Sequence, residues 1–198
     1  MKISEGTFEE KFVGFLVNRV SNRLELSRED SLKIEYGLNI LVINLVKMII
    51  IYSSSITLEC FKETLIVHSS FCILRRYNYG FHFNSNLVCT LFGILLFVLF
   101  PFTMKYFNYD IPIYHNLTIL LILNLCIISI GPSHTKNQLF SNEKNKLKPI
   151  LFTMLLSLSS LFLSNTSLDT YLTSGIFSSV LLVIMNTIYL RRMVYEKR

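Results

Sequence analysis

The stretch Leu87–Met104, LVCTLFGILLFVLFPFTM, decides the class of fold, because it runs over a membrane-spanning length without a charged side chain. A helix that crosses a hydrocarbon core of about 30 Å needs about 20 apolar residues, with a lower limit near 17. Three further runs meet this limit: Leu38–Leu58, which holds Lys47, Ile113–Ile130 and Tyr171–Leu190. The sequence therefore predicts an all-α, polytopic membrane bundle.

Composition supports this interpretation and leaves the number of passages open between four and six. Hydrophobic residues make up 52% of the chain and charged residues 16%, whereas soluble domains carry about 25% charged residues. Mean hydropathy is +0.49. Two weaker runs, Thr64–Leu74 and Pro149–Ser164, are short or rich in serine. Either one would add a passage, full or re-entrant.

The placement of charge favours six passages, with both termini in the cytoplasm of a multi-pass cell-membrane protein. Short cytoplasmic loops carry an excess of Lys and Arg. With six passages the inner segments hold Arg75, Arg76, Lys136, Lys144, Lys146, Lys148, Arg191, Arg192, Lys197 and Arg198. The outer loops hold two basic residues, Lys62 and Lys105, against Glu59, Glu63, Asp110 and Asp169.

The residues before the first span predict a cytoplasmic helical segment. Residues 1–37 mix acidic and basic side chains, unlike a secretory signal peptide. Apolar residues recur there at helical spacing: Phe8, Phe12, Phe15, Leu16, Val20 and Leu24. This amphipathic helix lies either in the inner interface or on the protein's own cytoplasmic face. Ser27 and Asp30 then form an N-cap signal for a helix that runs into the first span. The predicted organisation is segment 1–37, bundle 38–190 and basic tail 191–198.

Several function classes are excluded by missing patterns. The four cysteines form no CxxC pair, so neither structural zinc nor a redox pair is indicated. The sequence has no glycine-rich phosphate loop and no HExxH motif, which argues against nucleotide binding and against an intramembrane metalloprotease. The net charge of +6 maps onto one membrane face, where it favours anionic lipid over nucleic acid. We expect no metal and no cofactor.

One histidine and one cysteine form a candidate catalytic pair at a membrane boundary. His82 precedes Cys89 by seven residues, which would be about 10.5 Å along an unbroken helix and too far for a hydrogen bond. Gly80 and the polar residues 84–86 predict an irregular chain around His82, with a helix beginning near Asn86. Cys89 then lies in its first turn, where the helix dipole favours a thiolate, and a nearby histidine would activate the thiol.

A rival pair, His68 and Cys72, shares a helix face at i, i+4. It lies inside the weakest span, where no polar loop admits a substrate, so it ranks lower. Asn84 or Asn86 could orient the imidazole or stabilise an oxyanion, and no third catalytic residue is identified.

The stretch Arg75-Arg76-Tyr77-Asn78-Tyr79-Gly80-Phe81-His82, with Cys89 seven residues on, resembles the signature of the accessory gene regulator B (AgrB) membrane peptidases of Gram-positive quorum sensing. That signature runs roughly Arg-Arg-Tyr-x-Gly-Gly-x-His. Chain length, span count and basic inner loops agree with the family over nearly the whole chain. Tyr79 replaces the first glycine, and Phe83 stands where a small residue is usual.

The resemblance implies a cysteine endopeptidase that processes a short, AgrD-like precursor peptide. Cys89 would attack a peptide bond near the precursor's C-terminus, with His82 as general base and then general acid. The resulting thioester would allow an internal cysteine of the peptide to close a thiolactone ring, while a lactone or a linear product depends on the substrate. Arg75 or Arg76 would anchor the interface or grip an acidic precursor tail, or both would serve membrane topology alone. Gly80 would give the backbone room. Basic linker residues such as Lys136 would bind the same peptide, or serve topology alone.

The alternative from a different class is a non-catalytic transporter or accessory subunit, in which His82 and Cys89 are ordinary packing residues. Such a protein would carry ionisable residues deep in its spans, and Lys47 is the clearest candidate. A homodimer is compatible with so small a bundle, but no interface is legible in the sequence.

Overall fold

The computed structural model describes residues 13–17, 19, 27–78, 80, 81, 83, 85–131, 147–163 and 166–195, and side chains as far as residue 190. These residues are helical or lie in short connections, and none of them forms a strand. The chain divides into two compact units, residues 1–53 and 54–198, which are described separately. The predicted all-α class is confirmed.

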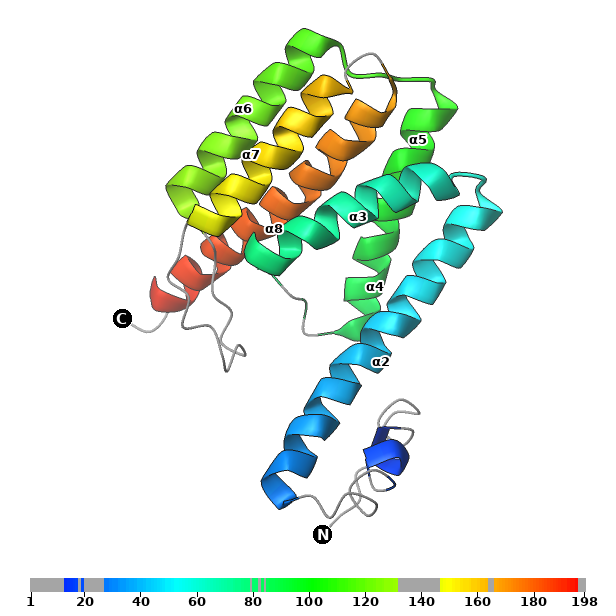
Figure 1. The fold of residues 1–198 in the computed structure, drawn as a ribbon, viewed down its shortest axis with the longest axis vertical. Helices are drawn as coiled ribbons and strands as arrows, with labels where there is room; N and C mark the ends of the chain where they lie inside the picture. The colour runs from blue at the N-terminus through cyan, green and yellow to red at the C-terminus, as the bar shows by residue number, and fades with distance from the viewer. Residues whose placement is uncertain are drawn as a thin grey trace. The chain divides into compact units, whose positions relative to one another are not determined.

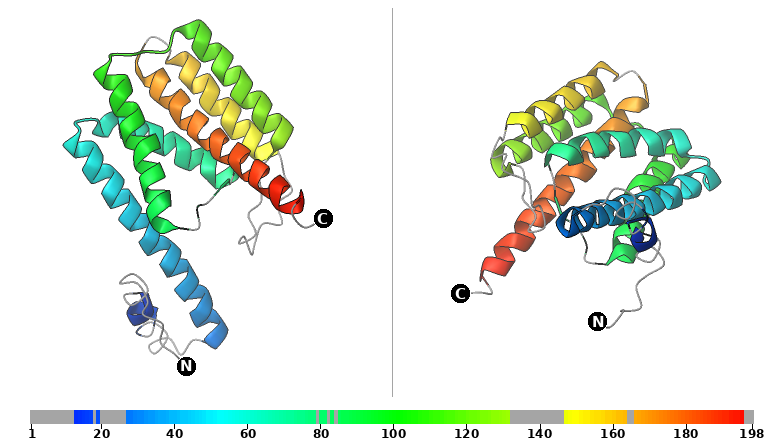
Figure 2. Two further views of the ribbon diagram at one scale, coloured as in Figure 1. Left: turned by 180° about the vertical axis from the view of Figure 1, so that it is seen from behind. Right: turned by 60° about the horizontal axis from the view of Figure 1, so that its bottom comes forward.

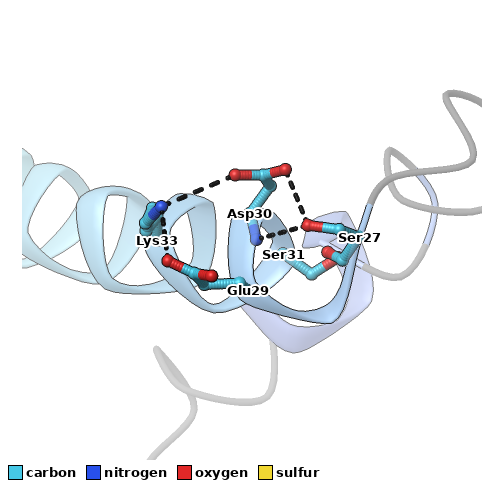
Figure 3. Close-up of polar contacts among 5 residues, drawn as sticks. All are labelled: Ser27, Glu29, Asp30, Ser31 and Lys33. Carbon is cyan, nitrogen blue, oxygen red and sulfur yellow. Dashed lines mark hydrogen bonds and ion pairs between the residues drawn. The ribbon is translucent and has the colours of Figure 1, made fainter.

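The first unit contains most of helix α2, Arg28–Thr57, whose start carries the predicted cap. Figure 3 shows the Asp30 backbone N–H donating to Ser27 Oγ at 3.2 Å and the Ser27 hydroxyl donating to the Asp30 carboxylate at 2.7 Å. These bonds satisfy one of the amides that a helix leaves unpaired at its start. Lys33 also lies 2.9 Å from Glu29. The predicted helix start is therefore confirmed.

Only part of the predicted N-terminal amphipathic helix can be compared with the structure. Residues 13–17 and 19 are helical. Phe15 is 60% exposed, whereas Val13 and Val17 are buried. The other predicted apolar positions at Phe8, Phe12, Val20 and Leu24 lie outside the described residues.

The second unit is a helical bundle (Figures 1 and 2). Its elements in chain order are α3 (Phe61–Asn78), α4 (Asn86–Ile94), the π-helical turn η1 (Leu95–Leu99), α5 (Phe100–Tyr106), α6 (Ile113–Ile130), α7 (Leu147–Phe162) and α8 (Leu168–Tyr195). Helices α6, α7 and α8 lie side by side and contact one another, and α3 packs across α8, α7 and the α4–η1–α5 helix. A cluster of buried apolar residues joins α3, α6 and α8: Leu74, Leu120, Leu123, Ile127, Ile176, Val180 and Val183.

Helix α8 packs against α3, α6 and α7, and small residues on its buried faces allow this close packing. Buried serines and threonines recur along it: Thr170, Thr173, Ser174, Ser178 and Ser179. At Gly175 the backbone of α8 lies so close to α3 that a Cβ would come within 1.8 Å of Ser70 Oγ and 2.6 Å of the Val67 carbonyl oxygen. Small residues are what allow close helix packing in membranes, where the hydrophobic effect does not hold helices together.

The helix that begins at Asn86 continues through η1 into α5 without a break. Pro101 lies just after the π turn, and a proline inside a helix removes one backbone donor and crowds the preceding turn. A π turn widens the helix locally and relieves such crowding. In the same segment the Val98 carbonyl accepts a weak hydrogen bond from the Cys60 thiol at 3.9 Å.

Contacts between the helices of the second unit occur near both of its ends. At one end the Tyr77 ring of α3 stacks on Phe152 of α7, with centroids 4.0 Å apart. At the other end the Ile111 backbone N–H donates to Thr170 Oγ1 at 3.0 Å, and Lys105 lies 3.1 Å from Glu63.

Within the part of the chain that the structure describes, four helices are long and apolar enough to span a membrane: Arg28–Thr57, Asn86–Tyr106, Ile113–Ile130 and Leu168–Leu190. They cover the four clear spans of the sequence except for Leu58, which follows the end of the first helix at Thr57, and Ile113–Ile130 agrees at both ends. The two weaker runs also form helices, α3 and the shorter apolar α7. The chain is thus compatible with a multi-pass membrane protein, and six passages with cytoplasmic termini remain a prediction.

Candidate active site

Cys89 lies in the first turn of α4, as predicted. Ser85 is the N-cap residue, with extended backbone angles of φ −93° and ψ 127°. The Cys89 backbone N–H makes the first bond of the helix, to the Ser85 carbonyl at 3.1 Å. Its thiol is free and half-buried. A thiol in this position is accessible and close to the positive end of the helix dipole.

The segment between α3 and α4 is held by an arginine side chain. Arg75 Nη2 donates to the carbonyl oxygens of Gly80 at 3.1 Å and Phe81 at 2.9 Å. Burial lowers the pKa of this guanidinium to about 10, an effect that attraction to Cys89 and Cys72 partly opposes. The group therefore keeps its charge near pH 7 and lies within electrostatic reach of Cys89.

Gly80 is buried at this point and adopts a φ of +136°, which residues with a side chain rarely adopt. A Cβ on Gly80 would come within 2.2 Å of Arg75 Nη1 and 3.2 Å of the Leu182 carbonyl oxygen. Both the backbone angle and the space thus require glycine. The role predicted for Gly80 is to give the backbone room, and the groups that come close at this position are the Arg75 guanidinium and the Leu182 main chain.

Aromatic rings fix the two sequence neighbours of His82. The Phe81 ring packs edge-on against Tyr189 of α8, with centroids 5.4 Å apart, and its backbone N–H donates to the Leu182 carbonyl at 2.9 Å. The Phe83 ring contacts Phe92 of α4 at 5.1 Å and Phe81 at 5.0 Å. Phe92 lies three residues after Cys89, so these contacts link the segment to the helix that carries the thiol.

The end of α3 is tied to α8 as well. Asn78 is fully buried, and its Nδ2 donates to Ser179 Oγ at 3.5 Å. Among the residues that the structure describes, none donates a hydrogen bond to its Oδ1. A buried acceptor without a donor is costly, so this amide is an unusual feature beside the candidate site.

The structure describes only part of the predicted site. It includes Arg75, Gly80 and Cys89, which it brings together, and it places Arg76 and Asn86 as exposed residues at the end of α3 and the start of α4. His82, Asn84 and Lys136 lie outside the described residues. The contacts from α8, made by Leu182, Ser179 and Tyr189, were not predicted, because nothing in the local sequence marks residues about a hundred positions away.

The rival pair has a different environment. The His68 ring is buried and lies 4.9 Å from the Phe97 ring and 6.4 Å from the Phe71 ring, while Cys72 is exposed on the same helix. An aromatic enclosure of this kind is common for a packed histidine. Among the described residues, no group of three or more His, Cys, Asp or Glu side chains could hold a metal ion.

A family model, Accessory gene regulator B, matches residues 11–188, a range that contains the whole candidate site. The chain belongs to this family. Membership supports a role in the accessory gene regulator quorum-sensing system.

Individual relatives agree with the family match. Accessory gene regulator protein B of Staphylococcus intermedius is 33% identical over 141 residues, which cover 70% of this chain and 74% of that protein. The protein of the same name from Staphylococcus saprophyticus is 32% identical over 162 residues, covering 78% and 84%. An AgrB-like protein of Listeria welshimeri is 30% identical over 152 residues, covering 75% and 72%. No solved structure matches the chain.

Proposed function

We propose that this chain is a membrane-embedded cysteine endopeptidase that removes the C-terminal tail of a short precursor peptide in quorum sensing. The observation that carries the proposal is the position of Cys89. It opens a helix directly after the segment that bears His82, and both neighbours of His82 are anchored, Phe81 to α8 and Phe83 to α4. A thiol and an imidazole at such a junction are the two groups that nucleophilic acyl transfer needs.

In the proposed reaction, His82 takes the proton of the Cys89 thiol, and the sulfur adds to the carbonyl carbon of the scissile peptide bond. The carbon–nitrogen bond then breaks, and the imidazolium gives its proton to the leaving amine. The tail departs as a free peptide, and the remainder stays on Cys89 as a thioester.

Cyclisation follows from the same thioester. The thiol of a cysteine inside the bound peptide attacks the acyl carbon, a thiolactone forms, and the proton of that thiol returns to Cys89. One thioester replaces another, so this exchange costs little energy. An oxygen ester formed by a serine nucleophile would have to rise in energy to give the same ring, which is a physical reason for cysteine at this position.

The partner and orientation form part of the proposal. The precursor would meet the site at the inner membrane face, to which the exposed Arg76 at the end of α3 would belong. Lys136 belongs to the same predicted inner surface and would contact an acidic peptide tail. The N- and C-termini would then lie in the cytoplasm of a Gram-positive cell.

The test is intact-mass spectrometry of the purified protein after incubation with a precursor peptide. Wild type should gain a peptide-sized adduct that hydroxylamine removes, and both Cys89→Ala and His82→Ala should lose tail release while still inserting into membranes. Cys72→Ala and His68→Ala serve as matched controls and should retain cleavage. Loss of cleavage in the controls, with retention in the first two variants, would move the site to α3.

A non-catalytic transporter remains the competing function. Lys47, half-buried in α2, is the ionisable residue in a span that would favour it. Absence of both adduct and cleavage with several precursors would support that function over the peptidase.

A further inference from the structure

We propose that Arg75 is a positioning residue, which fixes the backbone of Gly80 and Phe81, directly before His82, to helix α3. The inference rests on the proposed peptidase function and concerns the rate of its chemical step. It differs from the roles expected of this arginine from the sequence, which were anchoring at the interface, binding of an acidic precursor tail, or topology alone.

The hydrogen bonds of Arg75 carry the argument. One nitrogen, Nη2, donates to two consecutive carbonyl groups, those of Gly80 and Phe81, and Phe81 is the residue directly before His82. A single side chain from α3 thus fixes two peptide units of the connection. The Phe81 N–H is bound in turn to the Leu182 carbonyl of α8, so this part of the backbone is held from two helices.

Arg75 and Arg76 differ in burial and in their electrostatic surroundings. The Arg75 side chain is half-buried and interacts electrostatically with Cys89, whereas Arg76 is exposed. A guanidinium whose Nη2 already binds two main-chain carbonyls has less capacity to hold a substrate carboxylate. Arg76 is therefore the better candidate for the tail and the matched control for Arg75.

A substitution at Gly80 tests the contact between Arg75 and this backbone independently. A methyl group there would come within 2.2 Å of Arg75 Nη1, so Gly80→Ala should displace the guanidinium while leaving the arginine and its charge in the chain. Loss of the arginine and addition of this methyl should therefore damage the same interaction.

The experiment compares Arg75→Met, Arg75→Lys, Gly80→Ala, Arg76→Met and His82→Ala in the full chain, each reconstituted in lipid nanodiscs. The first readout is the rate at which iodoacetamide alkylates Cys89 between pH 5 and 9, measured on the Cys89 peptide by mass spectrometry. It needs no precursor. The second readout is kcat and KM for a synthetic precursor with an acidic tail and for its analogue with amidated tail carboxylates.

We expect Arg75→Met and Gly80→Ala to lower kcat by roughly 100-fold, because a misplacement of about 1 Å can cost that much, with KM changed less than about threefold. Arg75→Lys should fall close to Arg75→Met, since the lysine nitrogen ends one bond short of the two carbonyls. Cys89 alkylation in all three should approach the pH profile of His82→Ala. Combining Arg75→Met with Gly80→Ala should cost less than the product of the two single effects, because both remove one interaction, while the strain of alanine at a φ of +136° remains. Arg76→Met should keep the wild-type alkylation profile.

Three results would overturn the proposal. Wild-type alkylation and kcat in Arg75→Lys would mean that charge alone matters. A rise in KM for Arg75→Met that disappears with the amidated tail would mean that Arg75 binds the tail. Wild-type kcat and wild-type Cys89 alkylation in Gly80→Ala would mean that the contact of Arg75 with the Gly80 and Phe81 carbonyls has no role in the reaction. If Cys89 is alkylated in His82→Ala with the wild-type pH profile, His82 does not activate Cys89 and the proposed peptidase function fails. This outcome is distinct from the other three because it appears without any change at Arg75.

Discussion

Replacing Gly175 by alanine should loosen the packing of α3 on α8. The new Cβ would lie 2.6 Å from the Val67 carbonyl oxygen and 1.8 Å from Ser70 Oγ. A serine hydroxyl can rotate away, but a backbone carbonyl cannot. Because carbon contacts are optimal near 3.5–4.0 Å, α3 must move by about 1 Å or more.

The magnitude follows from two opposing effects. Overpacking a tight contact typically costs about 1–3 kcal/mol, while alanine in place of glycine in a helix returns roughly 0.5–1 kcal/mol. We expect a net loss of about 1–2 kcal/mol, which for a chain of this size lowers the unfolding temperature by about 2–8 °C. Cleavage should also fall, because α3 carries Arg75 five residues after Ser70.

The assay is thermal unfolding in detergent, in a background with Cys72, Cys89 and Cys126 replaced by alanine, followed with a thiol-reactive dye that reports exposure of the fully buried Cys60. Gly37→Ala is the matched control, since a Cβ at Gly37 in α2 meets nothing within 4 Å. Ser70→Ala combined with Gly175→Ala should recover only part of the loss, because the carbonyl contact remains. An unfolding temperature for Gly175→Ala at or above that of Gly37→Ala would refute the reasoning.

Two further substitutions test contacts at opposite ends of the bundle. Phe83→Ala removes the ring that joins the His82 segment to Phe92, so initial rates of precursor cleavage should fall about tenfold; Phe92→Ala should do the same, and a double variant that falls by the product of the two would contradict the shared contact. Thr173→Val deletes the hydroxyl that donates to Asn116 Oδ1 at 2.7 Å inside the bundle and should cost about 1–3 kcal/mol in the same unfolding assay. Thr187→Val, whose hydroxyl bonds within α8, should cost less; an equal loss would count against a special role for the buried pair.

Local signals were predictable from the sequence. Ser27 and Asp30 marked the start of α2, the polar residues 84–86 marked the start of α4, and the absence of charge marked Ile113–Ile130. Each of these features depends on residues within a few positions of one another. Hydrophobicity and helix caps act over that range, so a single chain read in order reveals them.

The contacts of Arg75 were not predictable for a physical reason. Its hydrogen-bond partners are main-chain carbonyls, which every residue carries, so no side-chain pattern distinguishes them. The pairing of Phe81 with Leu182 and Tyr189, and of Gly175 with Ser70, depends on how helices far apart in the sequence pack. The sequence therefore indicated the chemistry of the candidate site but not what holds it in place.

The π turn at Leu95–Leu99 has a consequence for how this helix tolerates changes in length. A π turn accommodates one residue more than the α-helical turn it replaces. Deleting one residue from this segment would restore regular α geometry and leave Cys89 on one side and Lys105 on the other in nearly their present orientations. The same deletion within α6, which has no such turn, would rotate everything beyond it by about 100°. Length variation among related chains should therefore be tolerated in this span at η1, between the candidate site and the opposite end of the bundle.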